Sequence, residues 1–594
     1  MCGIVGYIGR GQAQPVLFSS LGKLEYRGYD SCGIAVLGSD IGLCKDTVRV
    51  KEMEKTAPRL TGVAGIGHTR WATHGEPSQV NAHPHCDCTG RIAVVHNGVI
   101  TNYQKLRKQL ADEGHNLVSQ TDTEVIPHLI EKYYDGDLER AVEMALCDVE
   151  GSYAIIVLMA GETKLVAARK DSPLIIGVGD RENFIASDVP AILDYTNRVV
   201  YLEEGDIAVV TADNIRVKGE GVAVDREEHR ILWSVQDAQK AGYKHFMLKE
   251  IHEQPKVVRD TLGEYISAAE PAADLAIVGG SGLEDVLMLA SGTSYHACLI
   301  GKYVIEELVK VPVRVELASE FNYSGQGSAG NKAIIITQSG ETADALKAMK
   351  RLKEAGCQVI AITNVVGSTA SRIADQVIYT RAGPEISVAA TKSFLAQLIA
   401  LYWLALPYSN IDIRRSDNLV TGLRQLPVRI QQILDNEAVI AEYAGQLAKF
   451  DNVFFIGRGI NYPVALEGAL KLKEVSYIHA EGYAAGELKH GPFALLGKDT
   501  PVIAVVARDN TYEAMLTNIK EIKARRSPVM ALVEEGDDAV SELADSVIAV
   551  PQVDAMFSPV VNAVALQLLA YYTATERGCP IDFPRNLAKS VTVE

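Results

Sequence analysis

The sequence predicts a multidomain α/β protein, in which an antiparallel-sheet domain precedes two doubly wound parallel-sheet domains. Three observations predict this order. The chain has 594 residues, enough for three or more domains of ordinary size. Short apolar runs are closely spaced in the first third of the chain, whereas later apolar runs alternate with helix-length segments. The later region also contains an internal repeat.

The first predicted domain covers residues 1–215. Its apolar runs are too close together for the crossovers that parallel strands need, which favours antiparallel sheet. The runs are 152–158, 164–168, 174–178 and 206–211. Helical patterns are expected to cover this sheet at 14–26, 103–113 and 124–134.

Residues 216–262 are predicted to connect the domains, because they are highly charged and show no sustained strand pattern. A helix is expected in the second half of this segment, at 243–254.

The rest of the chain is predicted to hold two copies of one domain, 263–425 and 426–584, and a tail at 585–594. Apolar segments of the first copy recur in the second at offsets of about 170 residues, far too long for a solenoid. The pairs are 286–290 with 453–456, 334–337 with 503–506, 359–363 with 529–533, and 374–378 with 544–548. Alternating strands and helices imply a parallel sheet that binds ligands at its carboxyl edge.

Composition excludes several classes of protein. A net charge of -17 argues against partners such as nucleic acid or an anionic membrane surface. Nine scattered cysteines do not resemble a disulfide framework and favour the reducing cytoplasm. The start lacks a basic leader with an apolar core, and the apolar stretch 394–406 is too short to span a bilayer. We expect 394–406 to be a buried helix.

Cys2 combines a thiol with a free α-amine once Met1 is removed. Such an amine titrates near roughly 7.7 to 8.0, so a fraction is unprotonated at neutral pH and can relay the thiol proton. A cysteine in second position can equally be incidental. The interpretation of Cys2 as a nucleophile therefore depends on other motifs of the domain.

Three further segments carry polar groups that suit acyl transfer. Arg70, within 68–75, can hold a carboxylate with two parallel hydrogen bonds. Asn97-Gly98 offers a side-chain amide and a backbone N–H to an oxyanion, and Asp122 offers a carboxylate to an ammonium group. The ordinary alternatives are, respectively, a surface ion pair, a hairpin turn and a helix N-cap. Together, the groups match what cleavage of glutamine requires.

In this order, the motifs resemble the glutaminase domain of the class II, or N-terminal-nucleophile (Ntn), amidotransferases. The resemblance is carried by residues 2–6, 24–30, 69–75 and 96–98. It implies an αββα antiparallel sandwich, with Cys2 as nucleophile and Asn97 and Gly98 as the oxyanion hole. It also implies the residues that hold glutamine, which are Arg70, Thr73, His74 and Asp122. Trp71 resembles the residue that gates the ammonia route.

Four possible metal ligands fall within six residues, at His83, His85, Cys86 and Cys88. Their spacing is not that of a common zinc motif, and a structural zinc site normally draws paired ligands from two places. Residues 81–84 also belong to the amidotransferase pattern. We therefore expect an ordered loop and no metal, with zinc as the alternative.

Two hydroxyl-rich loops of the first repeat, 291–294 and 337–342, follow predicted strands and precede predicted helices. Helix-start N–H groups with several hydroxyls suit a phosphate. N-capping is the alternative for one such loop, but two at corresponding sheet edges favour phosphate binding. The equivalent loops of the second repeat, 457–459 and 507–509, lose most of the hydroxyls. One repeat is thus expected to bind substrate and the other to contribute catalytic groups.

The second repeat contains an apolar helix with unexpected charges, at 466–477, and then the segment 486–492. Glu474 on the helix and His490 after it suit acid–base chemistry. A solvated helix face is the alternative for Glu474.

These segments resemble the paired sugar isomerase (SIS) domains of the glucosamine-6-phosphate synthase family, also called glutamine:fructose-6-phosphate aminotransferases (isomerising). The resemblance covers essentially the whole chain, including 584–594. It implies conversion of L-glutamine and D-fructose 6-phosphate to D-glucosamine 6-phosphate and glutamate, the first step towards UDP-N-acetylglucosamine. The sugar-phosphate residues it implies are Thr293, Ser294, Thr337, Gln338, Ser339 and Thr342. Thr337 stands where many relatives have serine.

The resemblance also implies a reaction sequence without a metal or organic cofactor. His490 would assist opening of the sugar ring, and Lys589 would hold the open ketose as a Schiff base. Ammonia channelled from the glutaminase site would replace the lysine, and Glu474 would move a proton from C1 to C2. Family members are commonly homodimers, and His490 resembles a residue that acts across that interface.

Three other functions share part of this pattern. A phosphoribosyl-transferring amidotransferase shares the first domain but lacks a duplicated isomerase unit. A regulator that only senses sugar phosphates leaves Cys2, Glu474 and Lys589 idle, and no basic recognition helix supports it. An isomerase or deaminase that uses free ammonia predicts a degenerate glutaminase domain, whereas this one is complete at every matched position.

Overall fold

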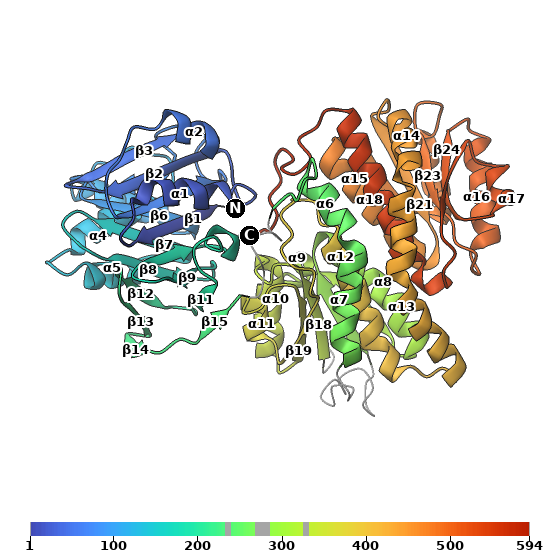
Figure 1. Ribbon diagram of the computed structural model, residues 1–594, viewed down its shortest axis with the longest axis horizontal. Coiled ribbons are helices and arrows are strands. Elements are labelled where there is room, and N and C mark those ends of the chain that lie inside the picture. Colours follow the sequence, from blue (N-terminus) through green and yellow to red (C-terminus); the bar gives the residue numbers. More distant parts are fainter. Residues whose placement is uncertain (1, 232–238, 268–284, 325–331, 593–594) are drawn as a thin grey trace. The chain divides into compact units, whose positions relative to one another are not determined.

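The structure is a computed structural model that describes residues 2–231, 239–267, 285–324 and 332–592 (Figure 1). The chain divides into two compact units. The first comprises Met1–Ala238 with Ser590–Glu594, and the second comprises Gln239–Lys589.

The first unit is built on two antiparallel sheets with helices outside them (Figure 1). One sheet has the order β15-β11-β9-β10-β1-β4-β2-β3, and the other has the order β14-β13-β12-β8-β7-β6-β5. The first sheet contains β1 (Gly3–Ile8), β2 (Ser31–Leu37), β3 (Ile41–Asp46), β4 (Ala64–Arg70), β9 (Ile175–Val178), β10 (Asn183–Ala186), β11 (Arg198–Tyr201) and β15 (Glu228–Arg230). The second contains β5 (His85–Cys86), β6 (Ile92–Ile100), β7 (Gly151–Met159), β8 (Leu165–Lys170), β12 (Ile207–Val210), β13 (Ile215–Gly219) and β14 (Val222–Val224).

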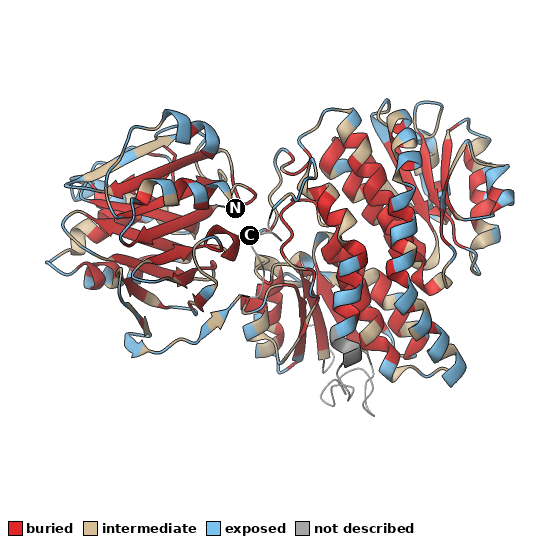
Figure 2. Cartoon of the chain, viewed as in Figure 1, coloured by how far each residue is buried: buried red, intermediate tan, exposed pale blue. Residues whose placement is uncertain are grey.

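Helices complete a four-layer arrangement around these sheets. Helix α1 (Ala13–Gly22) packs on β1 and β4, with α2 (Val50–Thr56) beside it. On the second sheet lie α3 (Tyr103–Asp112), α4 (Val125–Tyr133) and α5 (Leu138–Cys147). Apolar residues from facing strands, such as Ile4 and Ile156, form a core between the sheets, which Figure 2 shows as buried strands. The predicted αββα antiparallel sandwich is confirmed.

The expected connection at 216–262 differs from the structure. Strands β13, β14 and β15 extend the two sheets to Arg230, so the first unit continues past the expected end at residue 215. β14 and β15 are edge strands with half-exposed or exposed side chains, and charged residues are well tolerated there. The charged residues of these strands therefore masked the alternation of apolar and polar residues that predicts a strand. The helix expected at 243–254 is present as α6 (Phe246–His252).

The second unit contains two parallel sheets with the same strand order. The first has the order β17-β16-β18-β19-β20 and the second β22-β21-β23-β24-β25. Their strands are β16 (Val286–Ala290), β17 (Val313–Leu317), β18 (Lys332–Thr337), β19 (Gln358–Thr363), β20 (Gln376–Tyr379), β21 (Asn452–Gly457), β22 (His479–Ala484), β23 (Val502–Val505), β24 (Val529–Glu534) and β25 (Ser546–Val550). The matching order confirms the predicted repeat of a doubly wound domain.

Helices surround both sheets of the second unit, and long helices lie between them in Figure 1. They are α7 (Gln254–Ser267), α8 (Gly292–Leu308), α9 (Ala318–Phe321), α10 (Ala343–Glu354), α11 (Thr369–Ile373), α12 (Lys392–Ala405), α13 (Ile413–Asp435), α14 (Glu437–Leu447), α15 (Tyr462–Ser476), α16 (Tyr512–Lys523), α17 (Asp538–Ser541) and α18 (Ser558–Glu576). Helices α7 and α13 cross the boundaries expected at 263 and 426. One apolar cluster includes strands from both sheets, for example Met288 and Phe455, so the two repeats share a continuous core.

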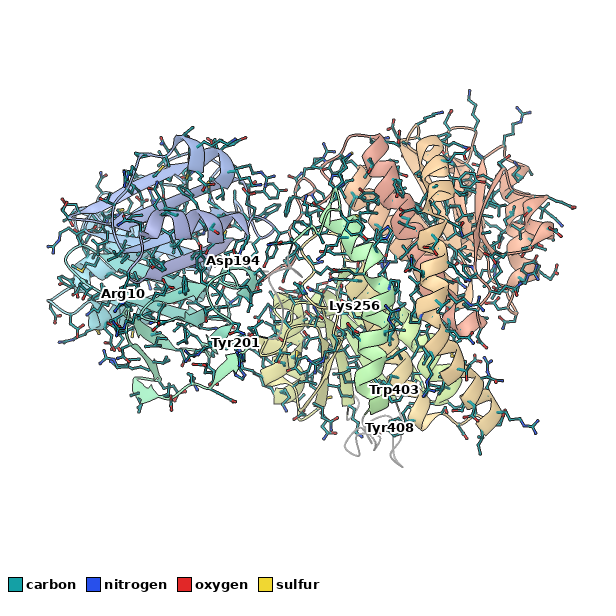
Figure 3. All side chains as sticks on the ribbon, in the orientation of Figure 1. Arg10, Asp194, Tyr201, Lys256, Trp403 and Tyr408 are labelled. Carbon is teal, nitrogen blue, oxygen red and sulfur yellow. The ribbon has the colours of Figure 1, made fainter. Side chains whose placement is uncertain are left out.

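Two helices of this core are nearly all apolar. α12 is the buried helix expected at 394–406, and it packs against α7 (Figure 3 labels Trp403 on α12 and Lys256 on α7). The segment Ala555–Glu576, which includes α18, is long and apolar enough to cross a membrane by length and composition. However, 83% of its apolar window is buried inside the unit, as for the core helix of a globular domain.

Candidate active sites

Cys2 lies at the start of β1, where two distant strands bring polar groups to it. Its Sγ accepts a hydrogen bond from the Trp71 backbone N–H at 3.3 Å. Its backbone carbonyl accepts from Asn97 Nδ2 at 2.9 Å and from Arg27 Nε at 3.2 Å. Burial raises the pKa of the Cys2 thiol, and the Trp71 N–H and the Arg70 charge oppose that shift. A buried neutral thiol needs a base before it can attack, consistent with an α-amine on the same residue.

Asn97 and Gly98 lie inside β6, opposite Ala154 and Tyr153 of β7, so the hairpin-turn alternative is wrong. Gly98 has φ +132, and a Cβ there would lie 2.1 Å from the Ser152 carbonyl oxygen. Only glycine fits this position. The Asn97 amide nitrogen has two N–H donors, of which one binds Cys2, so the other can reach an oxyanion.

Arg70 ends β4 and is only 3% exposed, so the surface-ion-pair alternative is wrong. Its guanidinium donates to backbone carbonyls of the next loop, including Gly75 at 2.9 Å and His74. A third bond, to the Glu76 carbonyl, is 3.5 Å long. Arginine has five N–H donors, so donors remain for a carboxylate in addition to these loop contacts. The contacts also order the loop that carries Thr73 and His74.

Asp122 accepts a hydrogen bond from the Ile100 backbone N–H at 2.8 Å and is 4% exposed. Helix α4 starts three residues later and has Glu124 at its N-cap, so the N-cap alternative for Asp122 is wrong. The free side of the carboxylate, Oδ1, lies 3.9 Å from His74 Nδ1. The same ring nitrogen is 3.3 Å from the hydroxyl of Thr73, which is exposed. Thr73, His74 and Asp122 are thus neighbours, as the predicted glutamine site requires.

The four possible metal ligands between 83 and 88 do not converge on one point. His83 and His85 point into the buried core, where His83 stacks on His68 with ring centroids 4.0 Å apart. His85 Nε2 lies 3.1 Å from the Thr121 hydroxyl. Burial lowers the pKa of both histidines. Cys88 is exposed and contacts a different set of residues.

The two hydroxyl-rich loops of the first repeat meet at one edge of the sheet, because they follow the adjacent parallel strands β16 and β18. In the second loop, the hydroxyls of Thr337 and Thr342 are 3.1 Å apart, and Ser339 Oγ accepts from the Glu341 N–H at 3.1 Å. Gly340 has φ +68 and no room for a Cβ beside Ser368. Gln338 lies in the same turn. This tight loop at the switch point of the sheet suits an anion.

The first loop is tied to other helices by its side chains. Ser294 is 9% exposed, and its Oγ accepts from Gln397 Nε2 at 3.0 Å. Thr293 Oγ1 donates to Glu467 at 3.0 Å and accepts from Lys471 Nζ at 3.0 Å. The hydroxyls of Thr293 and Ser294 are thus already bonded, and the backbone N–H groups at the start of α8 remain available to a phosphate.

Helix α15 carries a buried ionic network. Lys471 Nζ is 2.7 Å from Glu474 and 3.4 Å from Glu467, and His296 Nδ1 is 2.7 Å from Glu467. Burial alone would lower the pKa of Lys471, but Glu467 and Glu474 raise it. The solvated-face alternative for Glu474 is wrong, because its carboxylate pairs with a lysine that is 1% exposed. Glu467 and Lys471 were not among the residues predicted from the sequence, although their i, i+4 spacing in an apolar helix signals a buried pair.

Lys589 is enclosed, and its Nζ lies 2.5 Å from Glu385 Oε2. Glu385 also accepts from the backbone N–H groups of Thr391 at 2.9 Å and Ser393 at 3.0 Å. Burial alone would raise the pKa of Glu385, but Lys589 and the hydrogen bonds lower it to about 2. Glu385 therefore stabilises the Lys589 ammonium. Glu385 could not be predicted as a site residue from the sequence, because no local pattern joins residues 204 positions apart.

His490 ends the 3-10 helix Ala485–His490 and is exposed in the single chain. Within the described residues, no hydrogen bond or ion pair joins it to Glu474 or Lys589. The structure thus groups Glu474 with Lys471 and Lys589 with Glu385, and leaves His490 at the surface.

Comparisons with known proteins agree with this division. The SIS domain family matches residues 284–407 and 446–577, and the glutamine amidotransferase domain family matches residues 68–194. A solved structure, the C-terminal domain of glucosamine-fructose-6-phosphate aminotransferase from Francisella tularensis, is 36% identical with a TM-score of 0.55. It covers 58% of this chain and 99% of that chain.

Curated relatives match the chain from end to end. The glutamine–fructose-6-phosphate aminotransferase (isomerizing) of Caldanaerobacter subterraneus subsp. tengcongensis is 48% identical over 610 residues, covering 100% of both chains. The protein of that name from Methanosarcina acetivorans is 50% identical over 618 residues, again covering 100% of both. This chain belongs to the glutamine–fructose-6-phosphate aminotransferase (isomerizing) family.

Proposed function

We propose that this chain converts D-fructose 6-phosphate and L-glutamine to D-glucosamine 6-phosphate and glutamate. One observation carries the proposal: curated aminotransferases with this activity in their names match both units over the full length of the chain. Neither a lone glutaminase nor a lone sugar isomerase would have that match. The reaction starts amino-sugar synthesis, and we place it in the cytoplasm.

In the first unit, Cys2 attacks the side-chain amide of glutamine once Met1 is removed and its α-amine is free. The thiol passes its proton to that amine, and the proton then goes to the departing ammonia. Water next hydrolyses the glutamyl thioester, which releases glutamate and restores the thiol. Asn97 and Gly98 donate hydrogen bonds to the oxyanion. The α-carboxylate of glutamine binds Arg70, and its α-ammonium binds Asp122. Thr73 and His74 line the same site, and Trp71 gates the ammonia path.

In the second unit, the switch-point loops hold the sugar phosphate. We assign this role to the backbone of Thr293 and Ser294 and to the backbone and side chains of Thr337, Gln338, Ser339 and Thr342. Lys589 passes a proton to the neighbouring Glu385 carboxylate, and its free amine then attacks C2 of the open ketose. The Schiff base forms with loss of the C2 oxygen as water. Channelled ammonia replaces the lysine at C2.

Acid–base groups complete the isomerisation. Glu474 moves a proton from C1 to C2, and Lys471, whose Nζ is 2.7 Å away, holds its carboxylate in position. His490 is exposed in one chain, which supports a role across the interface of a homodimer, where it would open the sugar ring.

Nitrogen transfer tests the whole proposal. The full chain is incubated with fructose 6-phosphate and glutamine labelled at the amide nitrogen, and products are analysed by mass spectrometry. We expect labelled glucosamine 6-phosphate in amounts equal to glutamate, even when unlabelled ammonium is present. Glutamate without labelled sugar would show uncoupled hydrolysis and refute the proposal.

A further inference from the structure

Four metal-ligating side chains converge in the first unit, outside the proposed glutamine site. They are Cys88, His115, His128 and Glu131, whose ligand atoms all lie within 4.8 Å of one another. Cys88 Sγ is 3.6 Å from His115 Nδ1 and 3.4 Å from His128 Nδ1. Glu131 Oε2 is 3.0 Å from the first of these nitrogens and 3.4 Å from the second.

Three separate elements supply this cluster. Cys88 lies in the turn between β5 and β6, and Asp87 fixes that turn by accepting from the Ile92 N–H at 2.8 Å. His115 follows α3, whereas His128 and Glu131 are one helical turn apart on α4. One pair of ligands thus comes from a helix and the other two ligands come from two loops, and a structural zinc site commonly draws its ligands from separate segments in this way.

The spacing of the four atoms suits a tetrahedral ion. Zinc binds nitrogen and oxygen at about 2.0 Å and sulfur at about 2.3 Å, so neighbouring ligands of a tetrahedron are roughly 3.3 to 3.7 Å apart. Four of the six separations, between 3.0 and 3.6 Å, fall close to that range, and the other two are within 4.8 Å, so a small side-chain adjustment completes the tetrahedron. Charge also balances, since one thiolate, one carboxylate and two neutral imidazoles neutralise a divalent cation.

Hydrogen bonding alone explains the cluster less well. Cys88 Sγ already accepts from the Asn116 N–H at 3.5 Å, and Glu131 Oε2 already accepts from the Cys88 N–H at 3.2 Å. Without an ion, the Cys88 thiol can donate to only one of its neighbours, so the protons of the thiol and of the two rings must adopt one particular pattern for every contact to be a hydrogen bond. A metal-bound thiolate is the stronger acceptor for the Asn116 N–H.

We propose that Cys88, His115, His128 and Glu131 bind one divalent transition-metal ion, for which zinc is the best chemical match. The site is structural, because all four positions of the tetrahedron are taken by protein ligands. It fixes both ends of the segment that joins α3 to α4 and carries Asp122. The ion thereby holds the proposed glutamine site in shape without touching the substrate.

The first test measures metal in the full-length protein. After growth with added zinc and dialysis against a weak chelator, elemental analysis is expected to give about one zinc per chain. Replacing the zinc with cobalt is expected to give the visible bands of a tetrahedral ion and a thiolate-to-cobalt charge-transfer band. Wild-type protein that holds no zinc, also after reconstitution, would overturn the proposal. A cobalt spectrum without the thiolate band would overturn the assigned ligands.

Variants then locate the site. Cys88→Ser and His115→Gln are expected to lower bound zinc at least about tenfold. The matched control is Cys147→Ser, because Cys147 is an exposed cysteine in the same unit, at the end of α5. It should keep its zinc. Equal zinc in Cys88→Ser and wild type would refute the site, and the cobalt spectrum of wild type decides the question if either variant fails to fold.

Discussion

In the first unit, the Cys2 sulfur accepts from a backbone amide and a neutral asparagine lies beside it, whereas Lys589 in the second unit pairs directly with a buried ion. The difference follows from the chemistry proposed for each. A thiol and its oxyanion need preorganised N–H donors, but a Schiff-base lysine and a proton carrier need charges held out of water. Loss of one neutral hydrogen-bond donor should therefore slow glutamine hydrolysis in the first unit, whereas loss of a buried charged group should stop sugar conversion in the second.

The largest expected effect is at Lys589. Lys589→Arg keeps the ion pair with Glu385 but cannot form a Schiff base, so synthesis should fall at least about a thousandfold while glutamine hydrolysis continues. Lys256→Arg, at an exposed lysine of α7, is the control. Borohydride trapping with fructose 6-phosphate and peptide mass analysis should find the sugar on Lys589 alone. An adduct on another lysine would exclude this role.

Cys2→Ala should abolish glutamine-dependent synthesis and glutaminase activity, because no other group replaces the nucleophile. Synthesis from added ammonium salts should persist, since the proposed sugar site lies in the other unit. The control is Cys147→Ser, which should behave as wild type in both assays. Normal use of glutamine by Cys2→Ala would refute the assignment and break the contrast between the units.

A smaller loss is expected for Asn97→Ala, where a neutral donor is removed and the nucleophile remains. Glutaminase turnover should fall roughly 100 to 1,000 fold, the usual cost of one oxyanion-hole donor. The Michaelis constant for glutamine should change much less. If turnover is unchanged and only thermal stability drops, the role of Asn97 is structural, through its hydrogen bond to the Cys2 carbonyl.

The two repeats of the second unit allow a matched pair of substitutions. Thr342 and Thr511 are the N-cap residues of the corresponding helices α10 and α16. Thr342→Val should raise the Michaelis constant for fructose 6-phosphate about tenfold, the value of one hydrogen bond to a charged group. Thr511→Val should leave it unchanged. Equal effects would mean that both repeats bind phosphate.

The smallest expected effect concerns pH and stability. Burial and the neighbouring Glu385 raise the pKa of Glu250 from 4.5 to about 8. The folded protein thus keeps a proton that the unfolded chain releases, so stability from this group is present below pH 4.5 and declines as the pH rises to about 8. Glu250→Gln should remove that decline in denaturant unfolding curves. Parallel pH profiles for the two proteins would contradict the raised pKa.

Local sequence patterns were enough to predict both sheet types, the repeat and the residues around Cys2. They succeed where a signal lies within a few positions, as in 69–75 or at the ends of parallel strands. They fail where a partner is distant. Glu385 reaches Lys589 only through the fold, and Cys88 meets His115 and His128 instead of its sequence neighbours His83 and His85. Charged edge strands at 216–230 were mistaken for a connection because an edge tolerates polar residues.

The continuous core shared by the two repeats has a consequence for how the second unit melts and how it evolved. Strands of both sheets pack on the same central helices, so each repeat by itself would lose this shared core and keep only the smaller apolar cluster formed by its own residues. Calorimetry should then show one cooperative unfolding transition for the second unit. Each repeat expressed alone should expose the apolar surface that it normally buries against the other repeat, and should aggregate. Substitutions can therefore specialise either repeat, but deletion of one repeat would expose the apolar surface that the other packs against it.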